Sequence, residues 1–385
     1  MPAAAVSGRA VAGGSAVGFA AGWNIADTGA VAEELASAYG VGLAVVGLFT
    51  TALFLAHMVM QLPSGRLSDR LGPARVCAAG LLVLLACNAL ATVAPETWLV
   101  LVARTLMGAG TALAFIGGSD YVRAAGGSPF AQGLYGGLAT AGGGAALGVV
   151  PALDGALGWR APFVSAIAVA AGAGLLLAVS PHPATPGRTG ARVRTPVRAL
   201  ARDPGLVRLA VVFAASFGLS VVIGNWAVTL LERRTGLSAG AAGAVAALTL
   251  VLGVVSRPLG GWLLHRHAEH ARAGIAAAAL AGGAGTLALA SGSAVVAVAG
   301  ACIVGLAAGI AFAPAFSGAA RLHPQAPATA IGLVNATGAF TILAATPLVG
   351  AAFAAGAEVW AFAALAALWA ASALVSTTAR RSRRG

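Results

Sequence analysis

Twelve apolar runs, separated by short polar breaks, account for most of this sequence. A membrane-spanning helix needs roughly 20 consecutive apolar residues, because the hydrocarbon core of a bilayer is about 30 Å thick. Within lipid, every backbone polar group needs an internal partner, and a helix supplies one. The runs therefore predict an all-α integral membrane protein with twelve transmembrane helices. These helices are expected at residues 10–30, 41–62, 76–93, 98–118, 130–153, 161–179, 206–230, 239–264, 274–290, 294–316, 329–352 and 359–378.

The composition excludes the soluble classes of protein. Of the 385 residues, 59% are hydrophobic and only 9% are charged, so one soluble core cannot enclose all the apolar side chains. The net charge of +12 at first suggests a nucleic-acid partner, but the basic residues lie in the gaps between apolar runs rather than on one domain surface. We therefore expect the lipid bilayer as a partner and no nucleic acid.

The arginines predict the orientation in the membrane. With the N-terminus inside, the outer segments contain only Arg160, Arg233 and Arg234, and the other arginines of the connecting segments face the cytoplasm. This asymmetry follows the positive-inside rule. We therefore expect both termini to be cytoplasmic.

A cysteine in place of Gly187 tests this topology. In a variant that lacks Cys77, Cys87 and Cys302, we expect Gly187→Cys to react with a membrane-impermeant thiol reagent only after the cells are opened, because its segment is the richest in arginine. Labelling in intact cells would contradict the predicted orientation.

The chain divides into two similar halves. Residues 181–205 are rich in Pro, Arg, Gly and Thr, contain no apolar run, and are predicted to be a flexible cytoplasmic linker. The linker joins an N-terminal six-helix bundle, residues 1–180, to a C-terminal one, residues 206–385. A shift of 196 positions (261 − 65) aligns matching residues of the two bundles. The aligned pairs are Gly40 with Gly236, Gly47 with Gly243, Gly65 with Gly261, and Arg70 with Arg266.

The most specific motif follows the second predicted helix. Residues 65–75 read Gly-Arg-Leu-Ser-Asp-Arg-Leu-Gly-Pro-Ala-Arg. This resembles the loop signature of the major facilitator superfamily of secondary transporters. The resemblance implies a charge network that closes the cytoplasmic side, with Asp120 as a further partner. The motif positions are Gly65, Asp69, Arg70, Gly72 and Arg75.

Three other segments resemble motifs of the same family. Residues 104–110 are similar to its fourth-helix motif, whose arginine is linked to proton coupling, and residues 158–163 to the entry into its sixth helix. Gly144, Gly148 and Pro151 partly match the fifth-helix motif of antiporters. The resemblance implies the fold of this family, in which two six-helix bundles alternate access to a site between them.

Few ionisable residues lie inside the predicted helices. The chain has no lysine, and arginine does not release its proton, so a proton carrier must be Asp, Glu or His. An arginine at membrane depth costs about 2.5–3.5 kcal/mol and needs a partner or a watery cavity. Because Asp27 and Arg104 have matching depths, we expect them to face each other and to couple protons, with His57 as a second candidate.

Several other residues are candidates for the substrate cavity. Arg257, in the eighth predicted helix, either binds an anionic substrate or ties backbone carbonyls together, and the structural role is favoured. The remaining candidates have alternative accounts: the amides and the indole can form ordinary hydrogen bonds between helices, and the two phenylalanines can simply face lipid. They are Asn24, Asn225, Trp226, Asn335, Phe312 and Phe316.

Together these features predict a secondary active transporter of a small organic solute that is driven by protons, with efflux slightly favoured over uptake. The alternative is a symporter that takes up an anionic metabolite. An intramembrane enzyme is a remote alternative, because no catalytic cluster is apparent, and no ring of charges indicates a channel. We expect a functional monomer in the cell membrane, inner or plasma, without a cofactor or metal.

Overall fold

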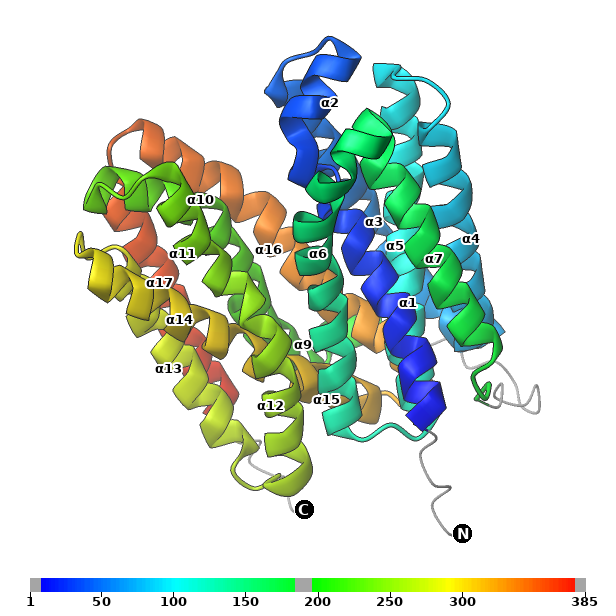
Figure 1. Ribbon diagram of the computed structural model, residues 1–385. Coiled ribbons are helices and arrows are strands. Elements are labelled where there is room, and N and C mark those ends of the chain that lie inside the picture. Colours follow the sequence, from blue (N-terminus) through cyan, green and yellow to red (C-terminus); the bar gives the residue numbers. More distant parts are fainter. Residues whose placement is uncertain (1–7, 184–195, 378–385) are drawn as a thin grey trace, which may run out of the picture.

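The computed structural model describes residues 8–183 and 196–377, and nearly all of them are helical. Gly187 and much of the predicted linker lie outside the described residues. The helices form two groups that stand side by side (Figure 1). The first contains α1 (Gly8–Ala26), α2 (Ala32–Tyr39), α3 (Leu43–Leu71), α4 (Pro73–Ala91), α5 (Thr97–Ala124), α6 (Pro129–Leu157) and α7 (Ala161–Ala178). After α8 (Val197–Arg202), the second contains α9 (Pro204–Phe213), α10 (Leu219–Thr235), α11 (Ala239–Val251), α12 (Gly253–Arg266), α13 (Ala271–Leu289), α14 (Ala294–Ile310), α15 (Phe312–Leu322), α16 (Pro327–Ala354) and α17 (Glu358–Thr377).

The described helices fit twelve membrane crossings. By length and composition, ten stretches are long and apolar enough to cross a membrane. One of them, Pro129–Ala178, has 50 residues, or about 75 Å of helix at about 1.5 Å per residue, which is enough for two crossings. It contains α6 and α7, joined by a short turn at Gly158–Arg160. With that stretch divided and α1 added, the count is 10 + 1 + 1, or twelve, within the described residues.

Three crossings of the second group are interrupted. A π-helical turn at Ala214–Gly218 separates α9 from α10, whereas Leu252 separates α11 from α12 and Ala311 separates α14 from α15. Proline explains the break at Ala311, because Pro314 cannot donate a backbone hydrogen bond and its ring displaces the carbonyl of Ile310, four residues earlier.

Helices α3 and α5 extend beyond their predicted ends. The second predicted helix stops at residue 62, but α3 continues to Leu71, so most of the motif at residues 65–75 is helical and Gly72 makes the turn with φ of +86°. Similarly, α5 reaches Ala124. Apolar runs underestimate such helices because the polar last turns protrude from the lipid but keep their backbone hydrogen bonds. The described part of the predicted linker also contains helix α8, which buries Leu200.

In Figure 1 the two groups converge toward one end and diverge toward the other, where α2 and the end of α10 lie. They contact each other through α3 with α16 and α6 with α12. We call the end at which they converge the motif end, because residues 65–75 lie there. Each group has its own apolar core, and a third cluster of buried residues, which includes Tyr135 of α6 and Phe312 of α15, joins them. Helix α1 begins and α17 ends at the motif end (Figure 1).

Candidate functional site

Asp69 connects the two groups at the motif end. Its carboxylate accepts hydrogen bonds from the backbone N–H groups of Ala328 and Thr329, both at 2.9 Å, and from the Thr329 hydroxyl. Both partners lie in the first turn of α16, where backbone N–H groups lack partners within the helix and the helix dipole favours an anion. An acid of α3 therefore caps a helix of the opposite group.

This contact differs from the expected charge network. Asp120 binds Arg123 at 2.6 Å and Ser68 at 2.7 Å, so its contacts stay within the first group. The sequence shows which residues are charged, but it does not show that the N-terminus of α16 lies opposite Asp69. That helix terminus, rather than a charged side chain, is the partner of Asp69. The motif arginines are exposed, and none of them forms an ion pair with a described residue; they are Arg66, Arg70 and Arg75.

Two glycines that the repeat aligns make equivalent contacts between the groups. A Cβ on Gly65 of α3 would lie 2.4 Å from the carbonyl oxygen of Ala328 in α16. A Cβ on Gly261 of α12 would lie 2.3 Å from the carbonyl oxygen of Pro129 in α6. Only glycine allows these approaches, so α3–α16 and α12–α6 are symmetric contacts. The symmetry is incomplete, because exposed His265 stands where the repeat would place an acid.

Asp27 and Arg104 form an ion pair inside the first group. Arg104 Nη1 donates to Asp27 Oδ1 at 2.9 Å, and both side chains are 0% exposed. The backbone N–H of Thr28 also donates to this oxygen, and Arg104 Nε donates to the carbonyl of Phe49 in α3. The pair therefore joins the end of α1, α3 and α5. Removing two charges from water is costly, and their attraction offsets this cost only when the ions pair closely.

The pair has unused hydrogen-bonding capacity. Among the described residues, Asp27 Oδ2 and Arg104 Nη2 have no hydrogen-bond partner although both atoms are buried. The oxygen that does not contact the arginine is thus available to carry a proton. His57, the second proton candidate, instead binds Thr111 through Nδ1 at 2.9 Å, between α3 and α5. This contact matches an ordinary packing role for the histidine.

Arg257 lies where α12 meets the first group. Its Nη1 donates to the carbonyl of Gly136 in α6 at 2.8 Å, and its guanidinium lies 4.8 Å from the ring centre of Phe312 and 5.4 Å from that of Phe217. Arg257 is 8% exposed and forms no ion pair with any described acid. It therefore ties the two groups through a carbonyl, and its charge is balanced by aromatic faces rather than by a carboxylate.

An aromatic cluster seals the contact between the groups. Phe312 and Phe316 of α15 pack on Phe115 of α5, with ring centres 6.5 and 6.2 Å apart, and on Phe213 of α9, at 6.1 and 5.2 Å. Tyr135 of α6 contacts Phe115 at 5.7 Å. Phe312 and Phe316 are buried in this cluster. Nothing in the sequence singles out Phe115, Phe213 or Tyr135, because aromatic residues in apolar runs give no signal of what they face.

The amide and indole candidates are scattered. Asn24 accepts a hydrogen bond from Asn88 at 2.7 Å inside the first group. Trp226 donates to the carbonyl of Thr346 and stacks on a phenylalanine inside the second group. Asn225 is exposed, and Asn335 is 4% exposed on α16. Asn24 and Trp226 are thus occupied by contacts within their own groups.

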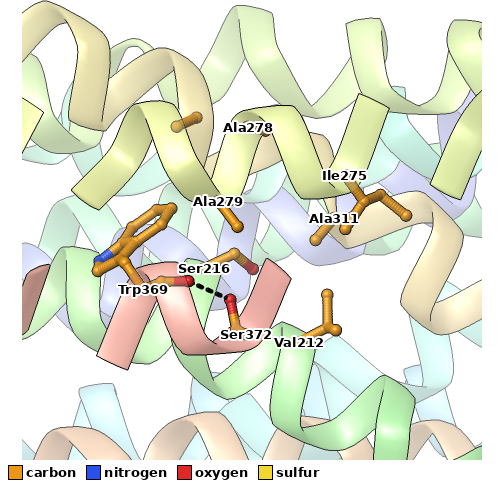
Figure 2. Close-up of a pocket in the computed structure, with 9 residues that line it drawn as sticks. Val212, Ser216, Ile275, Ala278, Ala279, Ala311, Trp369 and Ser372 are labelled. Carbon is orange, nitrogen blue, oxygen red and sulfur yellow. Dashed lines mark hydrogen bonds between the residues drawn. The ribbon is translucent and has the colours of Figure 1, made fainter. Parts of the chain in front are cut away.

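Two cavities lie among the described residues of the second group. The smaller, about 10 Å³, is bordered by Ser216, Trp369 and Ser372, whose hydroxyl donates to the Trp369 carbonyl at 2.7 Å (Figure 2). This volume is about that of one water and too small for an organic solute. The larger cavity, about 370 Å³, lies at the motif end. Near it, side-chain atoms of exposed His267, Glu269 and His270 lie within 4.8 Å of one another.

Comparison with known proteins gives a family. Residues 13–346 match the family model described as Major Facilitator Superfamily. No curated protein sequence gave a significant match. Among solved structures, the E. coli fucose:proton symporter FucP superposes with a TM-score of 0.76 at 18% identity, covering 95% of this chain and 97% of that chain. The human organic anion transporter MFSD10 superposes with a TM-score of 0.73 at 17% identity, covering 96% of this chain and 99% of that chain. The proton:xylose symporter XylE superposes with a TM-score of 0.72 at 12% identity, covering 95% of this chain and 94% of that chain.

One of the FucP structures similar to this chain is in the outward conformation, with the same TM-score of 0.76. At these low identities, the similar structures establish only the fold. The family model matches most of the chain and therefore establishes the family. The family and the fold agree with the twelve crossings and with the motif at residues 65–75. The chain belongs to the Major Facilitator Superfamily and is a multi-pass membrane transporter, not an enzyme.

Proposed function

We propose that this transporter is a monomeric, proton-coupled carrier that exports a small organic solute across the cell membrane. The buried ion pair of Asp27 and Arg104, 2.9 Å apart, carries the proposal. Ionisable residues at membrane depth are costly, and their presence there indicates function by default. The partial antiporter motif at Gly144, Gly148 and Pro151 supports the direction.

Transport would proceed by rocking of residues 1–180 against residues 206–385. The arginine asymmetry supports a cytoplasmic location for the motif end. The described conformation would then be closed to the cytoplasm by the Asp69 contact and the aromatic cluster, and open to the outside. Rocking toward the other state must separate α3 from α16 and α6 from α12.

The proton would bind Asp27 in only one of these states. While Arg104 is in contact, the carboxylate is stabilised as an anion. Both residues lie in the first group, so rocking of the two groups does not by itself separate them. If entry of the solute or closure of the outer side moves α1 relative to α5, the isolated carboxylate loses this stabilisation in a site of low dielectric, and protonation removes the cost of the buried charge. Re-formation of the pair would then release the proton. Such a cycle couples one proton to one change of state.

A flux assay tests the proposed function. A thermal-shift screen of the purified protein would first select solutes that raise its melting temperature. In proteoliposomes with a trapped pH indicator, we expect a selected solute to drive protons in the direction opposite to its own movement. Protons that move with the solute would show uptake by symport, and an absence of solute-dependent proton movement would reject proton coupling.

The second candidate function is uptake of an anionic metabolite. One observation favours it: Arg257 is a nearly buried cation at the contact between the groups, without an acid partner among the described residues. A carboxylate solute that reached this guanidinium would meet a preformed charge between two aromatic rings.

Substitution of Arg257 distinguishes the two candidates. If the solute is an anion bound here, we expect Arg257→Gln to weaken its binding tenfold or more, because a hydrogen bond to a charged group contributes about 1.5–3 kcal/mol. Arg257→Lys, which keeps the charge, should retain part of the affinity. Binding of anionic and neutral solutes would be compared by thermal shift. An equal loss for both would assign Arg257 a structural role as the tie to Gly136.

A further inference from the structure

The cavity of about 370 Å³ at the motif end of the second group has two chemically different layers. It is bordered by α9, α13 and α15, with α12 and α17 completing the wall. Each of the first three helices contributes one arginine, namely Arg208, Arg272 and Arg321. None of the described residues that border the cavity is acidic.

The arginines lie nearer the end of the molecule than three of the apolar residues that border the cavity. Helices α9 and α13 begin at the motif end, so Val212 lies four residues, or about 6 Å, deeper than Arg208, and Ile275 about 4.5 Å deeper than Arg272. Helix α15 ends there, so Pro314 is deeper than Arg321 by about 10 Å. The cavity therefore carries its cationic groups at its mouth, where Ala268, Ala271 and Leu322 also border it, and is apolar at its base.

One further feature adds positive potential at the mouth. Helix α13 starts beside Arg272 and its N-terminus has no side-chain cap, so the positive end of its helix dipole lies beside the arginine. The acids nearest to these arginines along the chain already contact histidines: Glu269 lies 3.0 Å from His270, and Asp203 lies 3.4 Å from His323.

We propose that this cavity binds the phosphate headgroup of an anionic phospholipid. Arginine guanidinium groups match phosphate oxygens in geometry and charge, and apolar residues one turn deeper suit the start of an acyl chain. A free phosphate ester would use the mouth but gain nothing from Val212, Ile275 and Pro314. Basic pockets between transmembrane helices on the cytoplasmic side are suited to anionic headgroups. The proposal is independent of the transported solute and of proton coupling.

The experiment uses the full chain in nanodiscs of phosphatidylcholine with increasing phosphatidylglycerol. We expect phosphatidylglycerol to raise the melting temperature and to remain bound in native mass spectrometry. In the double variant Arg272→Gln/Arg321→Gln, the apparent affinity for phosphatidylglycerol should fall about thirtyfold. Each basic residue near an anionic surface raises the binding constant about fivefold, and the variant lacks two of them. A wild-type response in this variant would overturn the proposal.

Two comparisons make the result specific. Arg198→Gln/Arg202→Gln removes two exposed arginines of α8, next to α9 but outside the cavity, and should respond to phosphatidylglycerol as the wild type does. If it loses the response equally, the effect comes from net charge and the site is rejected. Free glycerol phosphate should give no shift at concentrations at which the lipid saturates. An equal shift would assign the cavity to a soluble phosphate ester and overturn the lipid assignment.

Discussion

Asp69→Asn is expected to open the motif end. The carboxylate binds two backbone N–H groups and one hydroxyl in the first turn of α16, and an amide there must turn an N–H₂ group toward one of these donors. Loss of about 1–2 kcal/mol from this contact shifts the ratio of the two states about five- to thirtyfold toward the one that is open at the motif end. Transport should fall several-fold although the protein still inserts into the membrane.

Labelling of a buried cysteine measures this shift. Ala319 is 0% exposed in the cluster that joins the two groups, and Ala319→Cys, in a background without native cysteines, reports opening from the motif end. We expect Asp69→Asn to speed its reaction with a thiol reagent by the same five- to thirtyfold. Thr329→Val removes only the hydroxyl contact and should have a smaller effect.

Glu269→Gln is the matched control for Asp69→Asn. It removes one negative charge from the same end, but Glu269 is exposed, and its ion pairs within the described part of the chain are with the neighbouring His267 and His270. Labelling at Ala319→Cys should be unchanged in this variant. If Asp69→Asn changes neither turnover nor labelling, Asp69 does not hold the two groups together.

Much of the fold was predictable because membrane insertion constrains the sequence so strongly. Length and hydropathy determine which runs can cross a bilayer, and the repeat of residue types relates the halves. The structure supports the repeat in detail: Gly40 and Gly236, aligned by the shift, end α2 and α10 with φ of +63° and +69°. A positive φ favours glycine, so these two helix ends can be recognised in the sequence from the aligned glycines.

The partners of individual side chains were less predictable. Two charges of opposite sign at equal depth suggested the contact of Asp27 with Arg104, because each needs the other in lipid. By contrast, Asp69 binds backbone N–H groups, which every residue has, so no residue type in α16 indicates this partner. Of the aromatic cluster, Phe312 and Phe316 were among the candidates, but their partner Phe115 was missed for a similar reason, because it is one of many apolar residues in its helix.

The largest effect is expected at the buried pair. Asp27→Asn should abolish solute accumulation driven by an imposed pH gradient in proteoliposomes, but leave exchange of solute between the two sides. At a gradient of about one pH unit, one coupled proton supports at most a tenfold solute gradient in the wild type, and the variant should reach none. Asp27→Glu should retain partial coupling, because it keeps an acid. Arg104→Ala should be more damaging, since it leaves the acid unpaired.

Folding must be separated from coupling in these variants. Removal of one partner of a buried ion pair costs about 3–5 kcal/mol, so Asp27→Asn alone leaves Arg104 as an unpaired charge with 0% exposure. The double variant Asp27→Asn/Arg104→Gln removes both charges and keeps two amides that can bind each other, so its melting temperature should exceed that of either single variant. It should still exchange solute but not accumulate it.

The comparison of exchange with accumulation decides the role of Asp27. Asp120→Asn serves as the control, because it removes an acid of the same half that binds Ser68 and Arg123 rather than Arg104. It should leave the ratio of accumulation to exchange as in the wild type. If the double variant folds and still accumulates solute against its gradient, Asp27 is not the proton carrier. His57 is then the remaining candidate, and because its hydrogen bond to Thr111 joins α3 to α5, protonation there would act on the packing of these helices.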